Sequence, residues 1–189
     1  FLGLAFLSIS AFWQLYDSLI PLILKHTFEI GDTVSGVVMA LDNVLALFML
    51  PLFGALSDRV STPIGKRMPF IIGGTAAAVI SMILLPISDN LVNLPMFITA
   101  LFVTLIAMST YRSPAVALMP DVTPKPLRSK ANAVINLMGA LGAVVSLALI
   151  SFLVPDVGKP NYRPIFAIVG GLMVGAVVIL FFTIKENKL

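Results

Sequence analysis

The stretch that decides the fold is Gly54-Ala-Leu-Ser-Asp58-Arg59, followed after five further residues by Gly65-Lys66-Arg67-Met68-Pro69-Phe70. It is a charged segment with two glycines, and a long apolar run lies on each side of it. Basic residues gathered in a short segment between two apolar runs are typical of a cytoplasmic loop between membrane-spanning helices. We therefore expect a transmembrane helix on each side of this loop.

The composition excludes a soluble domain. Hydrophobic residues make up 59% of the 189 residues and charged residues 11%, and the mean hydropathy is +1.05, whereas soluble domains carry roughly 25% charged residues. Apolar runs of about 20 residues cross the ~30 Å hydrocarbon core as helices, and they are too long for the ~10-residue strands of a membrane barrel. We predict an all-α membrane protein, with residues 1–189 forming one unit of six transmembrane helices at about 2–24, 34–57, 68–88, 95–119, 130–154 and 164–184.

Basic residues in the loops predict the orientation. Eight lie in the loop after the second run, in the loop after the fourth run and in the tail, which holds Lys185 and Lys188, while the other side holds only Lys25, Lys159 and Arg163. The positive-inside rule places the richer side, and with it both termini, in the cytoplasm. We expect an integral protein of a cytoplasmic or plasma membrane. The net charge of +3 then reflects orientation, so no nucleic-acid partner is expected.

The connections are short and turn-rich, for example at 120–126 and 155–160, so no soluble domain is inserted. The chain has no cysteine, no phosphate-binding glycine loop, no His-Glu metal motif and no nucleophile with a matching base. We therefore expect neither an enzyme nor a cofactor or metal site. Because the chain opens on Phe1 rather than Met, we also expect that the natural start lies upstream.

Polar residues inside the apolar runs indicate the functional site, because an ionisable group at depth is costly unless it is paired or hydrated. Asp17 and Asp42 lie nearer the outer ends of their runs, and Arg112 nearer the inner end of its run. At ~1.5 Å per residue the two layers are about 8–10 Å apart, which is close to the length of one sugar unit. Aromatic rings beside these charges suit stacking on a sugar face. The candidate substrate-binding residues are Trp13, Tyr16, Asp17, Asn43, Tyr111, Arg112 and Asn136.

Each of these residues also has a structural interpretation. Arg112 could reach the inner interface with its long side chain, Asp42 could contact a neighbouring helix, and Asp17 could simply be hydrated. For cation coupling we favour Asp42 first and Asp17 second, because a carboxylate in a low-dielectric cavity binds a proton or sodium ion in a manner that nearby charge can alter.

The loop quoted first resembles the Gly-x-x-x-Asp-Arg … Gly-Lys-Arg signature of the major facilitator superfamily. Five residues separate Arg59 from Gly65, and Pro69-Phe70 follow the basic pair, as in glycoside-pentoside-hexuronide:cation symporters and the related sucrose transporters. Pro114-Ala-Val-Ala-Leu-Met-Pro-Asp121 resembles the end of the fourth span in that branch, although the arginine of that block is replaced by Val116. Arg112 lies one turn earlier on the same face.

This resemblance implies the N-terminal half of a transporter, built from two inverted three-helix repeats. It also implies a gating loop made of Gly54, Asp58, Arg59, Gly65, Lys66 and Arg67; ordinary positive-inside anchoring is the alternative for its basic residues. The expected function is secondary active transport of a sugar or glycoside, coupled to a proton or sodium ion by alternating access. The expected partners are the lipid bilayer, the small-molecule substrate, the cation, and a C-terminal six-helix half or a second copy. The alternatives are a membrane scaffold or assembly subunit, a membrane-embedded enzyme, and a facilitator for a molecule that is not a sugar.

Overall fold

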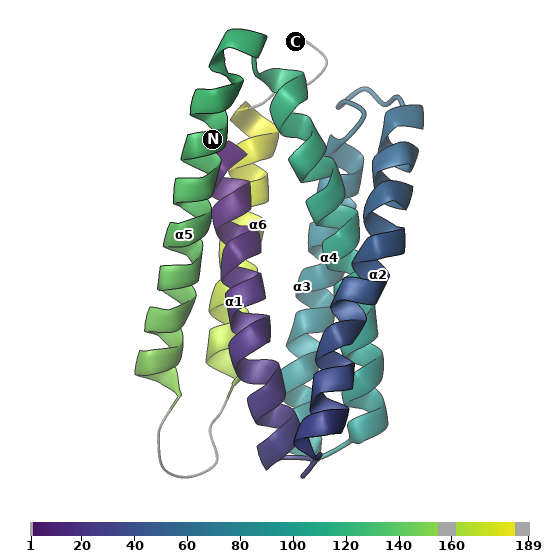
Figure 1. Ribbon diagram of the computed structural model, residues 1–189, viewed down its shortest axis with the longest axis vertical. Coiled ribbons are helices and arrows are strands. Elements are labelled where there is room, and N and C mark those ends of the chain that lie inside the picture. Colours follow the sequence, from purple (N-terminus) through teal and green to yellow (C-terminus); the bar gives the residue numbers. More distant parts are fainter. Residues whose placement is uncertain (1, 155–161, 184–189) are drawn as a thin grey trace.

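The computed structural model describes residues 2–154 and 162–183. Six long α-helices make up this part of the chain, and a single turn of 3-10 helix, η1, links the fourth to the fifth (Figure 1). Their bounds are α1 Leu2–His26, α2 Asp32–Arg59, α3 Met68–Leu91, α4 Leu94–Val122, η1 Lys125–Leu127, α5 Arg128–Leu153 and α6 Arg163–Thr183. The turn expected at 155–160 and the basic tail with Lys185 and Lys188 lie outside the described residues.

Each predicted span is one helix of the structure. The shortest helix has 21 residues and the longest 29, so at ~1.5 Å per residue each exceeds the ~30 Å thickness of the hydrocarbon core. All six are apolar enough to cross a membrane. The protein is therefore an integral membrane protein built as a helical bundle, as the composition predicts.

Local sequence explains where the helices begin and end. Pro69 and Pro95 stand in the first turns of α3 and α4, where a missing amide hydrogen costs nothing. The side chain of Asn93 accepts a hydrogen bond from the amide of Met96 at 3.2 Å, which caps the start of α4. Between these two helices Val92 adopts a left-handed conformation with φ 50°, which allows the chain to reverse direction within two residues.

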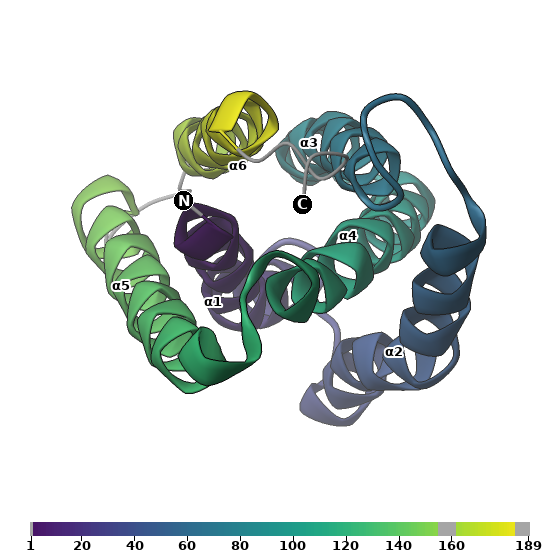
Figure 2. The same cartoon turned by 90° about the horizontal axis from the view of Figure 1, so that it is seen from above.

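The packing interlocks the two triplets of helices. Helix α1 packs against α5 and α6 of the second triplet, while α4 packs against α2 and α3 of the first, and α3 also contacts α6. Seen from above, α5, α1, α4 and α2 lie along one side, with α3 and α6 behind them (Figure 2). The first helix of each triplet thus packs on the second and third helices of the other, which is the arrangement expected of two inverted repeats.

Glycines allow the closest helix approaches. A Cβ atom at Gly142 would lie 2.1 Å from the carbonyl oxygen of Leu7, and one at Gly74 would lie 2.7 Å from the amide nitrogen of Tyr111. No side chain fits at either position, so these two glycines set the α1–α5 and α3–α4 contacts. The sequence also suggests close contacts at the Gly171-x-x-x-Gly175 pattern, but within the described chain nothing lies within 4 Å of a Cβ placed at either glycine.

Burial divides the helices into two groups. The core comes mainly from α1, α3, α4 and α6, whereas α2 and α5 expose large apolar side chains along most of their length. Leu47 and Phe48 on α2 are 70% and 64% exposed, and Leu137 and Val144 on α5 are 62% and 61% exposed. Lipid or another apolar surface is needed to cover these faces.

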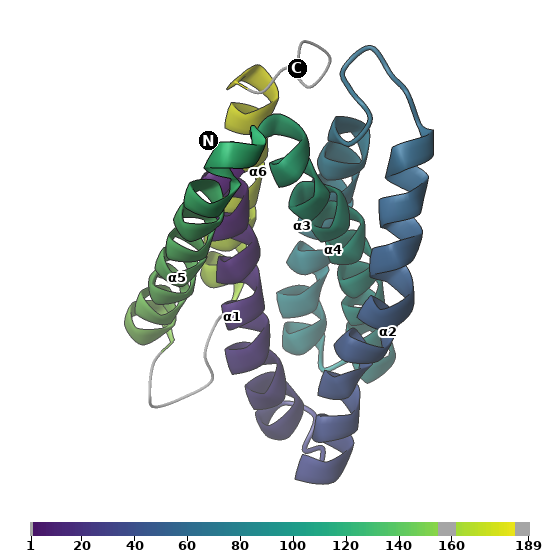
Figure 3. The ribbon, with the colours of Figure 1, turned by 45° about the horizontal axis from the view of Figure 1, so that its top comes forward.

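The loop 60–67, the turn at η1 and the start of α1 lie at the same end of the bundle, as does the end of α6 (Figure 3). The α1–α2 and α3–α4 connections lie at the opposite end. The structure thus gathers at one end the described segments for which the charge pattern predicts a cytoplasmic location.

Candidate functional site: a cavity beside α1 and a polar network at one end of the bundle

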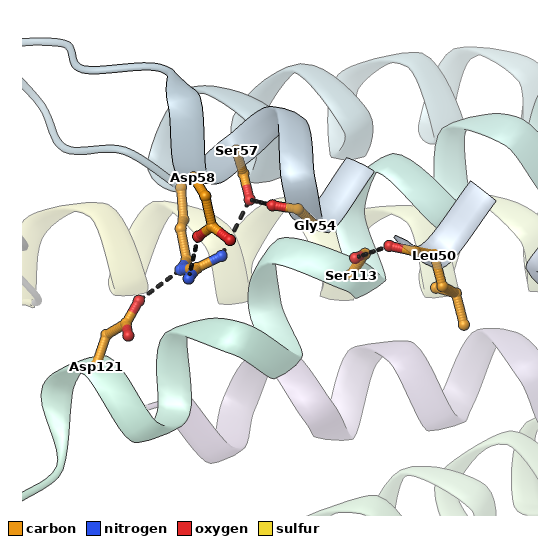
Figure 4. A network of polar contacts seen from close by, with 7 residues as sticks. Leu50, Gly54, Ser57, Asp58, Ser113 and Asp121 are labelled. Carbon is orange, nitrogen blue, oxygen red and sulfur yellow. Dashed lines mark hydrogen bonds and ion pairs between the residues drawn. The ribbon is translucent and has the colours of Figure 1, made fainter. Parts of the chain in front are cut away.

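The polar network is centred on Arg67, whose side chain is only 10% exposed. Its guanidinium donates to Asp121 Oδ2 at 2.5 Å, to Asp58 Oδ1 at 2.7 Å and to Ser57 Oγ at 3.0 Å. Asp58 and Ser57 lie at the end of α2 and Asp121 near the end of α4 (Figure 4). One guanidinium at the start of α3 therefore joins the ends of three helices, and its charge is balanced by two carboxylates.

Two further contacts tie α2 to α4 next to this network. The hydroxyl of Ser113 donates to the carbonyl oxygen of Leu50 at 2.6 Å (Figure 4). A Cβ atom at Gly54 would lie 3.3 Å from the same hydroxyl, so Gly54 allows α4 to approach. Ser57 donates to the carbonyl oxygen of Gly54 at 2.8 Å.

The backbone conformation at the second glycine of the loop, Gly65, explains why a glycine stands there. Gly65 adopts φ 122°, which side-chain-bearing residues rarely take. Its amide donates to the carbonyl oxygen of Thr62 at 3.1 Å, and the hydroxyl of Thr62 donates back to the carbonyl oxygen of Gly65 at 2.6 Å. This tight turn delivers Arg67 to the ends of α2 and α4.

A cavity of about 570 Å³ opens beside α1, between α4 and α5. Charged and amide side chains share its wall with apolar ones. The lining residues are Phe6, Ile9, Ser10, Trp13, Gln14, Asp17, Arg112, Val116, Met119, Asn132, Ile135, Asn136, Gly139 and Ala143.

Charge and aromatic surface meet in this cavity. The guanidinium carbon of Arg112 lies 5.7 Å from the ring centroid of Trp13, a cation–π distance. Asp17 follows Trp13 by one helical turn on the same face of α1. Within the described residues Arg112 forms no ion pair, so its charge is not neutralised by a protein carboxylate. A polar ligand can therefore meet a cation, a carboxylate, amides and a ring face in one cavity.

The family model of the Major Facilitator Superfamily matches residues 2–188, which is nearly the full length of the chain. The chain belongs to the Major Facilitator Superfamily. It is also similar to the sucrose transport protein SUC3 of Arabidopsis thaliana, with 25% identity over 155 residues. That alignment covers 72% of this chain but only 26% of the plant protein, so the chain spans about a quarter of that relative. The family is one of membrane transporters and is generally not enzymatic.

The cavity of this superfamily member brings together four of the predicted substrate-binding residues, namely Trp13, Asp17, Arg112 and Asn136. Val116 lines the same cavity. Val116 stands where the sucrose-type block has an arginine, and Arg112, one helical turn earlier, lines the same cavity. A cation thus remains on this face of α4 despite the departure from the motif.

The other predicted site residues lie around the cavity or apart from it. Tyr16 and Tyr111 are buried, Asp42 is half-buried and Asn43 is exposed on α2. The hydroxyl of Tyr111 lies 3.0 Å from that of Ser8 and donates to the carbonyl oxygen of Ala5 at 3.3 Å. These contacts give Tyr111 a place in the α1–α4 interface.

Of the three basic residues of the loop, Arg59 and Lys66 are exposed and Arg67 is buried. Arg67 is therefore the basic residue at the centre of the polar network. The motif did not distinguish these three basic residues. Asp121 was noted only as the end of a motif and proves to be a partner of Arg67. A sequence signal existed, because Asp58 and Asp121 end the second and the fourth membrane run, each beside a basic segment.

Gln14, Ser10 and Asn132 line the cavity although the sequence did not single them out as ligands. Ser10 lies one turn before Trp13, and Gln14 lies one turn before Asp17, so helical periodicity could have found them. Gln14 donates to Ser18 at 3.1 Å, which leaves its amide oxygen available to a ligand.

A separate polar contact lies at the opposite end of the bundle. Asp89 is 1% exposed and accepts a hydrogen bond from the hydroxyl of Thr27, which joins α3 to the end of α1. Burial raises the pKa of Tyr162 to about 12, and the negative charge of Asp89 adds to this effect. Tyr162 therefore stays protonated at any physiological pH. Within the described residues no group of three or more His, Cys, Asp or Glu is placed to hold a metal ion.

Proposed function

We propose that the protein moves a sugar or glycoside across the membrane together with a proton or sodium ion, by alternating access. The observation that carries the proposal is the cavity in which Arg112 lies over Trp13, with Asp17 one turn away. An aromatic face suits the C–H face of a sugar ring, while carboxylate, guanidinium and amide groups suit its hydroxyls. The similarity to a sucrose transport protein supports the same substrate class.

Cation coupling is assigned to Asp42 and Asp17. The two residues lie on α1 and α2, which pack against each other, and carboxylates of like charge held near one another favour binding of a proton or a cation. A cation held there changes the charge beside the sugar cavity, because Asp17 also lines that cavity. In this proposal the carboxylate of Asp17 thus lies beside both the sugar and the cation.

The Arg67 network is assigned to gating. It joins the ends of α2, α3 and α4 through contacts that a helix movement can break and remake. Arg59 and Lys66 remain exposed at the same end and are available to a neighbouring domain. We assign the residues Gly54, Asp58, Arg59, Gly65, Lys66 and Arg67 to this gating loop, with Asp121 as an added member.

A second six-helix unit completes the site in this proposal, as a C-terminal half or a second copy. The apolar faces of α2 and α5 and the open side of the cavity support the need for such a cover. This chain alone therefore does not transport. Saturable uptake by a verified monomer of residues 1–189 would refute that statement.

The direct test is uptake of radiolabelled sugars by the full-length protein in proteoliposomes, with an imposed proton or sodium gradient. We expect accumulation against the sugar gradient with one of the two cations. Binding and uptake of a non-sugar molecule alone would make the protein a facilitator of another class. Absence of flux for every small molecule tested would favour a scaffold role.

The orientation has its own test, because the chain contains no cysteine. Single cysteines introduced at the exposed Ser61 and Asn90 should react with an impermeant maleimide from opposite sides of the membrane, Ser61 from the cytoplasm. Labelling of both from the same side contradicts the proposed topology.

A further inference from the structure

An apolar groove of about 330 Å³ lies between α3 and α4, and it shares no lining residue with the cavity beside α1. Small residues on both helices make room for it, namely Gly73, Gly74, Ala77 and Ala107. The contact between the two helices requires Gly74 but not Gly73, because no described atom lies within 4 Å of a Cβ placed at Gly73. Gly73 therefore leaves space that helix packing does not use.

The chemistry of the groove suits a hydrocarbon chain. Val103 and Ile106 complete its wall and are 46% and 39% exposed. Its one polar side chain, Thr110, donates to the carbonyl oxygen of Ile106 at 3.0 Å, so this hydroxyl is already satisfied. None of the lining residues is charged. A sugar or an ion would find few partners here, whereas an apolar chain gains by covering this surface.

The depth of the groove matches that of a lipid tail. Helix α3 begins at Met68, so at ~1.5 Å per residue Gly73 and Ala77 lie about 8 and 14 Å from that end. The hydrocarbon core is ~30 Å thick, so the groove lies in the half of the membrane next to the loop 60–67. In the proposed orientation this half is the cytoplasmic leaflet.

The groove also lies on a helix that the proposed second half does not cover. The cavity is lined by α1, α4 and α5, and α3 stands behind the row formed by α5, α1, α4 and α2 (Figure 2). A second six-helix unit that closes the cavity packs on the front of this row. The α3 side of the bundle is thus left to the lipid.

A cation stands at the end of the groove that is nearest the loop. Lys66 precedes the start of α3 by two residues, is exposed, and forms no ion pair among the described residues. The loop 60–67 contains no acidic residue, and the nearby Asp58 is paired with Arg67. Cytoplasmic leaflets carry anionic lipids, and basic residues at the membrane surface attract their headgroups. Lys66 is thus placed for a lipid phosphate.

We propose that the groove between α3 and α4 binds one acyl chain of an anionic phospholipid, whose phosphate pairs with Lys66. Because Lys66 directly precedes Arg67, the bound lipid supports the loop that delivers Arg67 to the ends of α2 and α4. The inference goes beyond transport and does not depend on the sugar or the cation. It rests on the proposed orientation only for the leaflet that supplies the lipid.

The test is native mass spectrometry of the purified full-length protein in detergent. Dioleoyl phosphatidylglycerol and dioleoyl phosphatidylcholine are added separately, because they have the same acyl chains and differ only in the headgroup. We expect one molecule of phosphatidylglycerol to bind about fivefold more tightly than phosphatidylcholine, as expected for the pairing of one basic residue with an anionic headgroup.

Gly73→Leu tests the groove, because the new side chain fills it without displacing any described atom. This variant should retain one lipid molecule fewer than the parent with either lipid. Gly171→Leu is the matched control, since Gly171 is exposed on α6 and also has no described atom within 4 Å of an added Cβ. It adds the same side chain outside the groove and should bind lipid as the parent does.

Lys66→Gln tests the headgroup contact. It should lower affinity for phosphatidylglycerol about fivefold and leave affinity for phosphatidylcholine unchanged. Lys130→Gln removes an exposed cation at the start of α5 instead and is the control. Thermal unfolding midpoints equal to the parent's establish that the variants are folded.

The inference is wrong if Gly73→Leu retains as many lipid molecules as the parent, or if Gly171→Leu loses as many. Equal affinity of the parent for the two lipids would overturn the anionic assignment, as would an unchanged preference in Lys66→Gln. A lower unfolding midpoint in Gly73→Leu with no loss of lipid would show that another part of the protein covers the groove, which also contradicts the proposal.

Discussion

The Arg67 network and the cavity beside α1 both contain an arginine, but the two arginines are in opposite situations. Arg67 is buried and donates hydrogen bonds to Ser57 and to two carboxylates. Arg112 lies over an aromatic ring and, among the described residues, forms no ion pair. Beside it the donors of Trp13 and Tyr16 are buried without a partner in the described chain.

This difference separates two kinds of polar group in a membrane protein. A satisfied network holds helices together and makes their arrangement more rigid. Unsatisfied donors and charges cost free energy in the resting protein, and a ligand that supplies the missing partner recovers it. The comparison therefore predicts stability effects at the network and ligand effects at the cavity.

The largest effect is expected at Asp42, to which we assign cation coupling. Asp42→Asn should abolish accumulation of sugar against its gradient, while exchange of sugar down its gradient partly remains, because asparagine resembles the protonated acid. Uphill uptake and counterflow in proteoliposomes measure the two activities. Asp32→Asn, on the same helix but exposed and 3.9 Å from Lys25, is the control. If Asp42→Asn still concentrates sugar as the parent does, Asp42 is structural.

The network should respond through stability. Arg67→Ala removes the shared donor and leaves Asp58 and Asp121 without it, at a cost of about 2 kcal/mol in the free energy of unfolding, since both carboxylates are partly exposed. Arg59→Ala, an exposed neighbour in the same loop, should cost little. Thermal unfolding in detergent measures both. If Arg67→Ala and Arg59→Ala lose the same amount of stability, the hydrogen bonds of Arg67 do not stabilise the protein more than an exposed basic residue of the loop does.

Arg112 should respond through substrate affinity. Arg112→Lys replaces a planar fork on Trp13 with a point charge, and sugar affinity should fall about tenfold while the unfolding midpoint is unchanged. The same substitution at the exposed Arg128, which donates to the carbonyl oxygens of Pro120 and Thr123, is the control. Lower stability with unchanged sugar affinity would show that Arg112 has a structural role and does not bind the substrate.

The smallest effect is expected at Tyr111, which the sequence assigns to substrate binding and whose contacts are internal. Tyr111→Phe loses the bonds to Ser8 and Ala5 and should cost about 1 kcal/mol of stability. Its sugar affinity should equal that of the parent, as measured by equilibrium binding. Weaker sugar binding with unchanged stability would show that Tyr111 contributes to substrate binding after all.

The membrane spans could be predicted because each is decided by its own residues. Hydropathy along α1 or α6 needs no knowledge of the neighbouring helices. The same local reasoning named Trp13, Asp17, Arg112 and Asn136 as candidate ligands in two polar layers, and the cavity contains all four. It failed to separate Tyr111 from Arg112, because adjacent residues on a helix differ by about 100° in direction and only the packing of α1 against α4 shows which one faces the cavity.

The amino-acid sequence by itself determined the six membrane helices, the end at which the basic loops gather and the membership of the superfamily. These follow from hydropathy, charge and a local motif, each of which acts over a single turn or a single span. Only the tertiary structure decided that Arg67 rather than Arg59 or Lys66 joins the helix ends, that Asp121 is its partner, and that the hydroxyl of Tyr16 is buried with no hydrogen-bond partner among the described residues. The physical reason is distance along the chain: Arg67 and Asp121 are 54 residues apart, and helix packing alone brings them together.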